Sequence, residues 1–271
     1  MKPLQNLHTH TTYCDGADAP EEMILTAIEK GFKSIGFSGH SYMSFSPGHS
    51  MSIEGTEEYK KEIRSLKEKY AGQIDVYLGL EVEMHSGVDM TDYDYLIGSV
   101  HYFRFGEICV GFDRSAEEVR RVIDTYFGGN GMAYAKAYYE SLATLPEYGR
   151  FDVIGHFDLI TKHAERVRFF DEDSTDYRRY AIGAAEALAG RIPLFEVNTG
   201  AIARGYRTSP YPPAFLLKEL KRLGFGAIIS SDCHDRNKLD CGFKQAAQLL
   251  RDCGFKERFI LTERGFEPVG L

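Results

Sequence analysis

Short apolar runs alternate with amphipathic segments along the whole chain, and this alternation constrains the fold more than any other feature of the sequence. Helical segments between successive strands are typical of a parallel α/β fold rather than of a β-sandwich or a helical bundle. Seven β/α units predict a distorted (β/α)7 barrel of the TIM-like type, as a single domain over residues 1–271. The runs are Leu4–His8, Ser34–Phe37, Asp75–Val82, Tyr95–Val100, Asp152–Gly155, Leu194–Asn198 and Ala227–Ser231, with an extra strand at Phe259–Thr262.

Capping residues and glycines mark the helix boundaries. The start signals are Asp18, Thr56 and Ser115, each ahead of acidic residues, and Pro212-Pro213 ahead of Ala214–Leu223. Glycines at the expected C-terminal positions are Gly31, Gly72 and Gly224. Two segments are predicted to be loops, Ser41–Gly55 and Gly128–Gly131, and the first of them is a candidate lid over the functional site.

Charge and composition exclude several classes of partner. The net charge is −8, and the lysines and arginines are scattered among acidic residues, so nucleic acid is not an expected partner. No stretch reaches the roughly 18 to 20 apolar residues of a membrane helix, and the first residues lack the apolar core of an export signal. The five cysteines are odd in number and form no CxxC pair, which favours reduced thiols in the cytoplasm. The oligomeric state is left open.

Residues that bind metals follow one predicted strand after another. The C-terminal ends of parallel strands open on one face of a barrel, so these side chains are expected to converge there. Alternate residues of a strand point to the same side, so His8 and His10, and likewise Asp232 and His234, can each aim as a pair into the barrel mouth. The candidate ligands are His8, His10, Asp15, His40, Glu81, His101, His156, Asp232 and His234.

A metal centre explains this set better than isolated buried histidines do. A lone buried histidine is more often satisfied by a backbone carbonyl than bound to a metal. Six imidazoles with several carboxylates at one barrel end, however, would be electrostatically costly without cations. Nine candidate ligands exceed the roughly four to six that one ion accepts, so more than one ion is expected.

Other residues near these motifs are predicted to have different roles. Three histidines are expected at exposed positions away from the metals: His49, His85 and His163. Glu81 is preferred as a ligand over Glu83, which shares its face of the strand. Cys233 is expected to point away from the site between Asp232 and His234.

These motifs, in this order over about 230 residues, resemble the PHP superfamily, named for polymerase and histidinol phosphatase. The motifs are HTH at 8–10, Asp15, GH at 39–40, GLE at 79–81, SVH at 99–101, GH at 155–156 and SDCH at 231–234. Within the superfamily, the length and the segments IGHFDLITK and EVNTGAIARGYRTSPYP are similar to histidinol-phosphate phosphatases of the histidine pathway. The resemblance implies a distorted (β/α)7 barrel with two or three divalent ions, which could be Zn, Mn or Fe.

The resemblance also implies a ligand set for each ion. The sets are His8, His10, Glu81 and Asp232 for the first, Asp15, His40 and His234 for the second, and Glu81, His101 and His156 for the third, with Glu81 bridging. The implied reaction is hydrolysis of a small phosphate monoester, L-histidinol phosphate, by a metal-bound hydroxide. Asp232 or His234 would handle the protons. Arg204, Lys162 and Arg207 follow the fifth and sixth strands, so they are expected to bind the phosphate.

Three alternatives remain open at this point. A phosphoesterase of the same superfamily could act on a nucleotide or on phosphotyrosine, although the acidic net charge argues against a polymer of phosphates. An amidohydrolase barrel also uses an HxH motif and a late aspartate. A barrel that only stores or senses metal would retain ions without turning over any ester.

Overall fold

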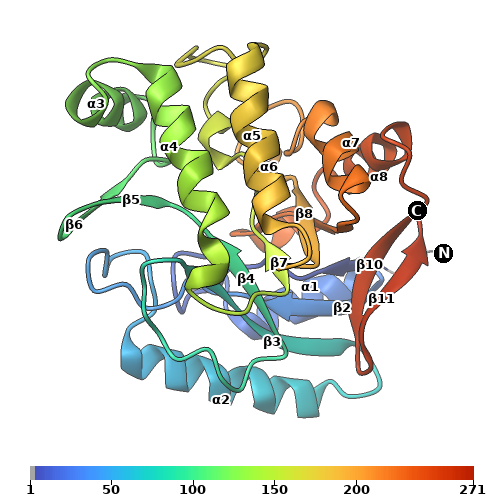
Figure 1. The fold of residues 1–271 in the computed structure, drawn as a ribbon. Coiled ribbons are helices and arrows are strands. Elements are labelled where there is room, and N and C mark those ends of the chain that lie inside the picture. The colour runs from blue at the N-terminus through green and yellow to red at the C-terminus, as the bar shows by residue number, and fades with distance from the viewer. Residues whose placement is uncertain (1–3) are drawn as a thin grey trace.

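Seven parallel strands form the central sheet of the structure, a computed structural model that describes residues 4–271. Their order in space follows their order in the chain, as expected when each strand is joined to the next by a crossover segment. Figure 1 shows the sheet with helices packed around it. The strands are, in spatial order, β1 (Leu4–Asn6), β2 (Phe32–Phe37), β3 (Asp75–Glu83), β4 (Tyr95–Ser99), β7 (Val153–Ile154), β8 (Leu194–Asn198) and β9 (Gly226–Ser230).

The first and last strands meet just beyond their C-terminal ends. Thr9 and Cys233 form a parallel bridge in which the His10 amide donates to the Cys233 carbonyl at 2.8 Å. The Cys233 amide donates in turn to the carbonyl of His8 at 3.0 Å. These two hydrogen bonds make the sheet a nearly closed barrel, which confirms the predicted distorted (β/α)7 architecture. We call this junction the seam.

Apolar side chains fill the inside of the barrel below the strand ends. The interior cluster comprises Leu7, Tyr77, Tyr95, Ile97, Val153, Leu194, Ile228 and Leu261. Tyr95 occupies the centre, where a Cβ on Gly79 would stand only 2.2 Å from its ring. Glycine is therefore required at position 79 to let the tyrosine fit, and the tyrosine hydroxyl donates to the Leu7 carbonyl.

Helices join the strands and cover the outside of the barrel. They are α1 (Pro20–Glu29), α2 (Ile53–Lys69), α3 (Ala116–Tyr126), α4 (Gly131–Ala143), α5 (Thr175–Leu188), α6 (Gly200–Ala203), α7 (Ala214–Arg222) and α8 (Phe243–Asp252), with 3-10 turns η1 (Leu145–Glu147), η2 (Leu159–Thr161) and η3 (Arg236–Lys238). The Ser115 hydroxyl caps α3 as predicted. The predicted start at Thr56 was wrong, because Ser52 accepts the amide of Gly55 and starts α2 one turn earlier. The cap predicted at Asp18 falls on Ala19.

Two antiparallel hairpins add to the barrel. The predicted extra strand is confirmed as part of β10 (Glu257–Thr262), which pairs with β11 (Gly265–Gly270). The Gln5 side chain bonds to both the amide and the carbonyl of Leu261, which ties this hairpin to β1 beside the chain ends (Figure 1). The second hairpin, β5 (Tyr102–Phe105) with β6 (Ile108–Gly111), was not predicted, and it begins directly after His101.

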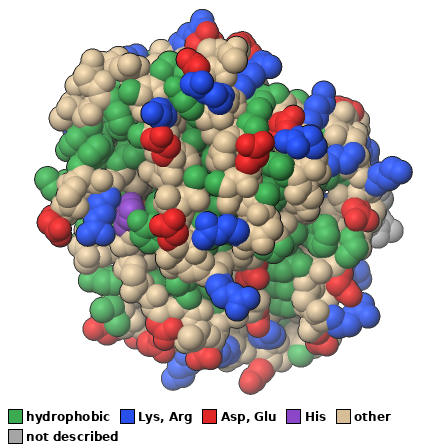
Figure 2. Space-filling view, viewed as in Figure 1, with side chains coloured by type: hydrophobic (Ala, Val, Ile, Leu, Met, Phe, Trp, Pro, Cys, Tyr) green, Lys and Arg blue, Asp and Glu red, His purple; other side chains and the backbone are tan. Residues whose placement is uncertain are grey.

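The outer surface carries charges of both signs. On the face in Figure 2, Lys and Arg are interspersed with Asp and Glu, and no continuous basic stripe crosses this face. Within residues 4–271, no helix is both long enough and apolar enough to cross a membrane.

Candidate metal centre

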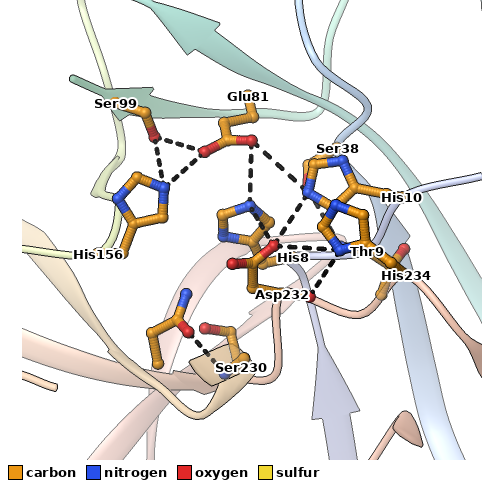
Figure 3. A network of polar contacts seen from close by, with 12 residues as sticks. His8, Thr9, His10, Ser38, Glu81, Ser99, His156, Ser230, Asp232 and His234 are labelled. Atoms are coloured by element: carbon orange, nitrogen blue, oxygen red, sulfur yellow. Dashed lines mark hydrogen bonds and ion pairs between the residues drawn. The ribbon is translucent and has the colours of Figure 1, made fainter. Parts of the chain in front are cut away.

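Glu81 contacts a cluster of imidazoles at the C-terminal ends of the strands, and Figure 3 shows its contacts with His8, His10 and His156. Glu81 is 1% exposed and lies on β3, between the ends of β2 and β4. One carboxylate oxygen, Oε1, accepts the Ser99 hydroxyl at 2.7 Å and lies 2.8 Å from Nε2 of His156. The other oxygen, Oε2, lies 3.3 Å from Nε2 of His8 and 2.8 Å from Nδ1 of His40. Glu81 therefore contacts imidazoles on both sides, as a bridging ligand must.

The HxH and DxH motifs face each other across the seam. Asp232 Oδ1 lies 3.2 Å from Nε2 of His10 and 3.7 Å from Nε2 of His8. Thr9 and Cys233, the middle residues of the two motifs, form the backbone bridge. Their side chains donate away from the site, to the carbonyls of Gly36 and Asp235 respectively. The predicted alternation of side chains at these strand ends is confirmed.

A second group stands nearer the surface. Asp15 Oδ1 lies 3.2 Å from Nε2 of His234, 3.6 Å from Nε2 of His40 and 3.8 Å from Nδ1 of His10. His101 completes the set on the other side, with its Nε2 3.5 Å from Glu81 Oε1 and 3.1 Å from Nε2 of His156. The structure thus brings all nine predicted side chains into one cluster. Three groups have a geometry able to hold an ion: His10–Asp15–His40–His234, His8–Glu81–His156 and His8–His10–Asp232.

Unpaired polar atoms indicate that the cluster fits cations. Nε2 of His8, Nε2 of His10 and Oε2 of Glu81 are buried and make no hydrogen bond with the described residues, 4–271. Buried polar atoms are nearly always paired, because an unpaired one costs about 1 to 3 kcal/mol. Nε2 of His8 and Nε2 of His10 lie 3.3 Å and 3.6 Å from Oε2 of Glu81, and a positive ion among these three atoms would satisfy them.

Backbone strain at two of these residues supports the same conclusion. Within residues 4–271, only three residues other than glycine have a positive φ, and two of them are His156 (37°) and Asp232 (46°). This region is unfavourable for residues with a Cβ, and such strain concentrates at functional sites. The strain here is compatible with side chains held toward the centre by the surrounding structure.

The electrostatics of the cluster are strongly coupled. Burial alone would lower the pKa of His40, but the carboxylates of Glu81 and Asp15 raise it to about 10. Burial and the neighbouring rings of His234 and His40 lower the pKa of His10 to about 3. Burial opposes the charge on Glu81, but the surrounding histidines hold its pKa well below the usual range. The carboxylates of Glu81, Asp15 and Asp232, whose pKa values are all lowered, therefore stay ionised at neutral pH, which is the form that binds a metal ion.

A cavity of about 380 Å³ opens onto the cluster. Seven of the nine candidate ligands line it, and its wall also carries three cationic side chains, Lys162, Arg204 and Arg114. Lys162 Nζ bonds to Asp113 at 2.9 Å. The loop between β2 and α2 contributes Met43 and His49, consistent with its placement beside the site.

Arg204 is held against the DxH motif. Its Nη2 donates to Asp232 Oδ2 at 2.8 Å, and its Nη1 donates to the Asp232 carbonyl at 3.1 Å and lies 3.0 Å from Nδ1 of His234. A Cβ on Gly200 would stand 2.9 Å from both the guanidinium and the Asp232 side chain. The glycine at the start of α6 thus lets the arginine reach the site.

Arg207, also expected at the phosphate, lies elsewhere. It is absent from the cavity lining, and its Nη1 donates to the Thr161 carbonyl at 2.8 Å. Glu165 lies 3.8 Å from its Nε. The guanidinium is therefore used to hold η2, the turn that precedes Lys162, and the structure gives no support for a contact with substrate.

Asp158 sits beside this arginine in a position that should make stability depend on pH. It is fully buried, and burial raises its pKa to about 7 although Arg207 opposes the shift. A carboxyl group whose pKa is higher in the folded than in the unfolded state ionises more readily in the unfolded chain. Its ionisation therefore lowers the free energy of unfolding as pH rises from about 4 through 7. We expect the free energy of unfolding of Asp158→Asn, relative to that of wild type, to increase by about 2 to 4 kcal/mol between pH 4.5 and pH 8. Urea denaturation of both proteins at each pH measures this, and a difference independent of pH would contradict it.

The three histidines that were predicted to be exposed differ in their burial. His163 was predicted to be exposed but is 4% exposed, because its Nε2 contacts the Asp113 carbonyl at 2.9 Å. His85 is half-buried against the Tyr148 ring. His49 is exposed as predicted, yet its Nδ1 lies 4.0 Å from Asp15 at the cavity mouth.

Several residues of the site had not been predicted. Asp113, Arg114 and Tyr102 reach the cavity from the unpredicted β5–β6 hairpin and the segment after it. Glu196, in the middle of β8, contacts His8 from behind at 2.9 Å. A charged residue inside an apolar strand was the available signal, since a buried charge requires a partner.

The fold and the cluster together define the class of protein. A parallel barrel that gathers histidines and carboxylates around a buried glutamate at its strand ends is a metal-dependent hydrolase barrel. Residues 6–200 match the PHP domain, and the chain belongs to the PHP family.

Named relatives match this chain over nearly its whole length. It is 30% identical over 268 residues to the probable histidinol-phosphatase of Deinococcus radiodurans, covering 94% of this chain and 95% of the relative. It is 25% identical over 269 residues to the histidinol-phosphatase of Bacillus subtilis, covering 90% and 97%. The histidinol phosphate phosphatase of Lactococcus lactis, solved with Zn, L-histidinol and phosphate, has a TM-score of 0.74 at 22% identity over 97% of this chain and 98% of that one. That likeness confirms the fold.

Proposed function

We propose that this chain hydrolyses L-histidinol phosphate to L-histidinol and phosphate in histidine biosynthesis, using a centre of two or three divalent metal ions. The convergence of nine histidine and carboxylate side chains around Glu81, with buried ring nitrogens left unpaired, carries the proposal. The relatives from Deinococcus radiodurans and Bacillus subtilis, which match nearly end to end, support the choice of substrate.

The ligand sets expected from the family are compatible with the distances. We assign the ions to His8, His10, Glu81 and Asp232, to Asp15, His40 and His234, and to Glu81, His101 and His156. His10 also lies within the second group, through its Nδ1, 3.8 Å from Asp15. Bound divalent ions would supply positive charge to the phosphate oxygens and lower the pKa of a bound water. Zn, Mn and Fe all suit this mixture of nitrogen and oxygen ligands.

The protein's own groups would position the ester and move its protons. Arg204 has N–H groups left over after bonding Asp232, and these would bind non-bridging phosphate oxygens together with Lys162. Asp232 and His234 would take a proton from the attacking water and return one to the leaving alcohol as the ester P–O bond breaks. Tyr102, Tyr206 and Leu159 line the outer cavity and would contact the organic part of the ester.

Phosphate release and metal content, measured on the same purified protein, test this function. We expect more than one equivalent of Zn, Mn or Fe per chain, and a higher kcat/KM for L-histidinol phosphate than for a nucleotide or phosphotyrosine. Stoichiometry of one or less after growth in metal-supplemented medium would contradict the multinuclear centre. Preference for another ester would contradict the substrate, and amide hydrolysis without phosphate release would contradict the reaction.

A further inference from the structure

Two buried glutamates stand behind the histidines of the cluster, on the side away from the centre. Glu196 Oε2 lies 2.9 Å from Nδ1 of His8, and Glu83 Oε2 lies 3.1 Å from Nδ1 of His101. Both residues are buried, at 0% and 2% exposure, and neither belongs to a group able to hold an ion. In each case the opposite ring nitrogen, Nε2, faces Glu81.

A chain of hydrogen bonds from Gly200 through Asn198 holds Glu196 in place, and the Gly200 amide, which can only donate, fixes the direction of each bond in it. The backbone amide of Gly200 donates to Asn198 Oδ1 at 2.8 Å, so the amide nitrogen of Asn198 must face the other way. That nitrogen donates to Glu196 Oε1 at 2.8 Å. The Ser230 hydroxyl donates to Oε2 at 2.5 Å. Both carboxylate oxygens accept in these contacts, so Nδ1 of His8 carries the hydrogen of its contact with Oε2.

We propose that Glu196 is a positioning residue that sets the tautomer of His8, so that its Nε2 lone pair is available to a metal ion. The inference rests on the proposed metal centre. A neutral imidazole has one donor and one acceptor nitrogen, and the partner of one nitrogen decides the role of the other. Carboxylates behind metal-binding histidines orient the ring and raise its basicity, and their loss commonly weakens metal binding by about 10- to 100-fold.

Glu196→Gln tests the direction of these bonds because it changes almost no volume. Asn198 would still donate, so the glutamine oxygen would turn toward Asn198 and its NH2 would turn toward His8. His8 would then accept at Nδ1 and carry its hydrogen on Nε2, toward the centre. After removal of metal with a chelator, we expect Glu196→Gln to bind Zn²⁺ about 10- to 100-fold more weakly than wild type at one class of site. Competition with a zinc-binding dye measures this affinity.

A double exchange, Glu196→Gln with Asn198→Asp, should restore the lost affinity. The new aspartate would accept from both Gly200 and the glutamine NH2, which leaves the glutamine oxygen facing His8 as an acceptor. The net charge is the same as in wild type. We expect the double variant to bind Zn²⁺ at least several-fold more tightly than Glu196→Gln alone.

Thermal denaturation with and without Zn²⁺ separates positioning from a general structural role. The difference in Tm between the Zn²⁺-loaded and the chelator-treated protein should be smaller for Glu196→Gln than for wild type, because a ligand that binds more weakly stabilises the folded state less. The control is Gln5→Met, which loses three buried hydrogen bonds on β1 at the far end of the barrel and should lower both Tm values equally. Unchanged Zn²⁺ affinity in Glu196→Gln, or a double variant no better than the single one, would overturn the proposal. Wild-type protein that binds no Zn²⁺ would instead contradict the proposed function.

Discussion

Replacing Glu81 by glutamine should nearly abolish turnover and lower the metal content of the purified protein. The carboxylate lies within 3.6 Å of ring nitrogens from five histidines, and in wild type its charge is compensated by them or by cations. Removing one partner from a buried set of charges costs roughly 3 to 5 kcal/mol, which corresponds to about two to four decades in kcat/KM. Steady-state kinetics with L-histidinol phosphate and elemental analysis measure the two effects.

Glu83→Gln is the matched comparison, because it makes the same chemical change two residues along the same strand. Glu83 bonds to the backbone amide of His101 at 2.8 Å and to its ring, and lies behind that ring rather than between metals. We expect a smaller loss, about one to two decades, acting through a single histidine. Equal activity of the two variants would show that Glu81 is not the bridging carboxylate.

Arg204→Lys should lower kcat/KM about as much as Arg204→Ala does. The guanidinium bonds to Asp232 with part of its donor set, and its planar fork would offer the rest to phosphate, whereas lysine has one compact charge. Losing a charge-assisted contact of this kind costs on the order of 1.5 to 3 kcal/mol, or roughly one to two decades. Metal content should stay near that of wild type, because the arginine is not a ligand.

Arg207→Lys provides the control for this experiment. It is the same substitution three residues away, at a side chain that holds Thr161 outside the cavity. We expect a lower Tm with little change in kcat/KM. Unchanged kinetics in both Arg204 variants would show that Arg204 does not bind the ester, and loss of metal would show that it supports the ligands instead.

The barrel was predictable because its strands follow one another in space as they do in sequence. Periodicity located every one of the seven strands, but it did not reveal the β5–β6 hairpin. That hairpin pairs Tyr102–Phe105 with Ile108–Gly111 through a turn of two residues, and its strands are short and partly exposed. Short runs of this kind carry little periodic signal, and their pairing depends on contacts with the rest of the fold.

The nine candidate ligands could be placed together because parallel strands end on one face. Arg204 and Arg207 could not be separated in this way, since both follow β8 and only the turn after Gly200 decides which one enters the cavity. Likewise, spacing gives the face on which Glu83 lies but not whether it contacts a metal or the back of a histidine. Those distinctions depend on side-chain contacts between distant segments, which local patterns do not encode.

The seam has a consequence for how the protein is made. His8 and His10 leave the ribosome more than two hundred residues before Asp232 and His234, which face them across the seam. Until β9 emerges, the nascent chain exposes an HxH pair without its acidic counterpart. Any ion captured earlier would be bound by an incomplete set of ligands and readily exchanged. Full occupancy of the proposed metal sites would therefore follow the translation of β9.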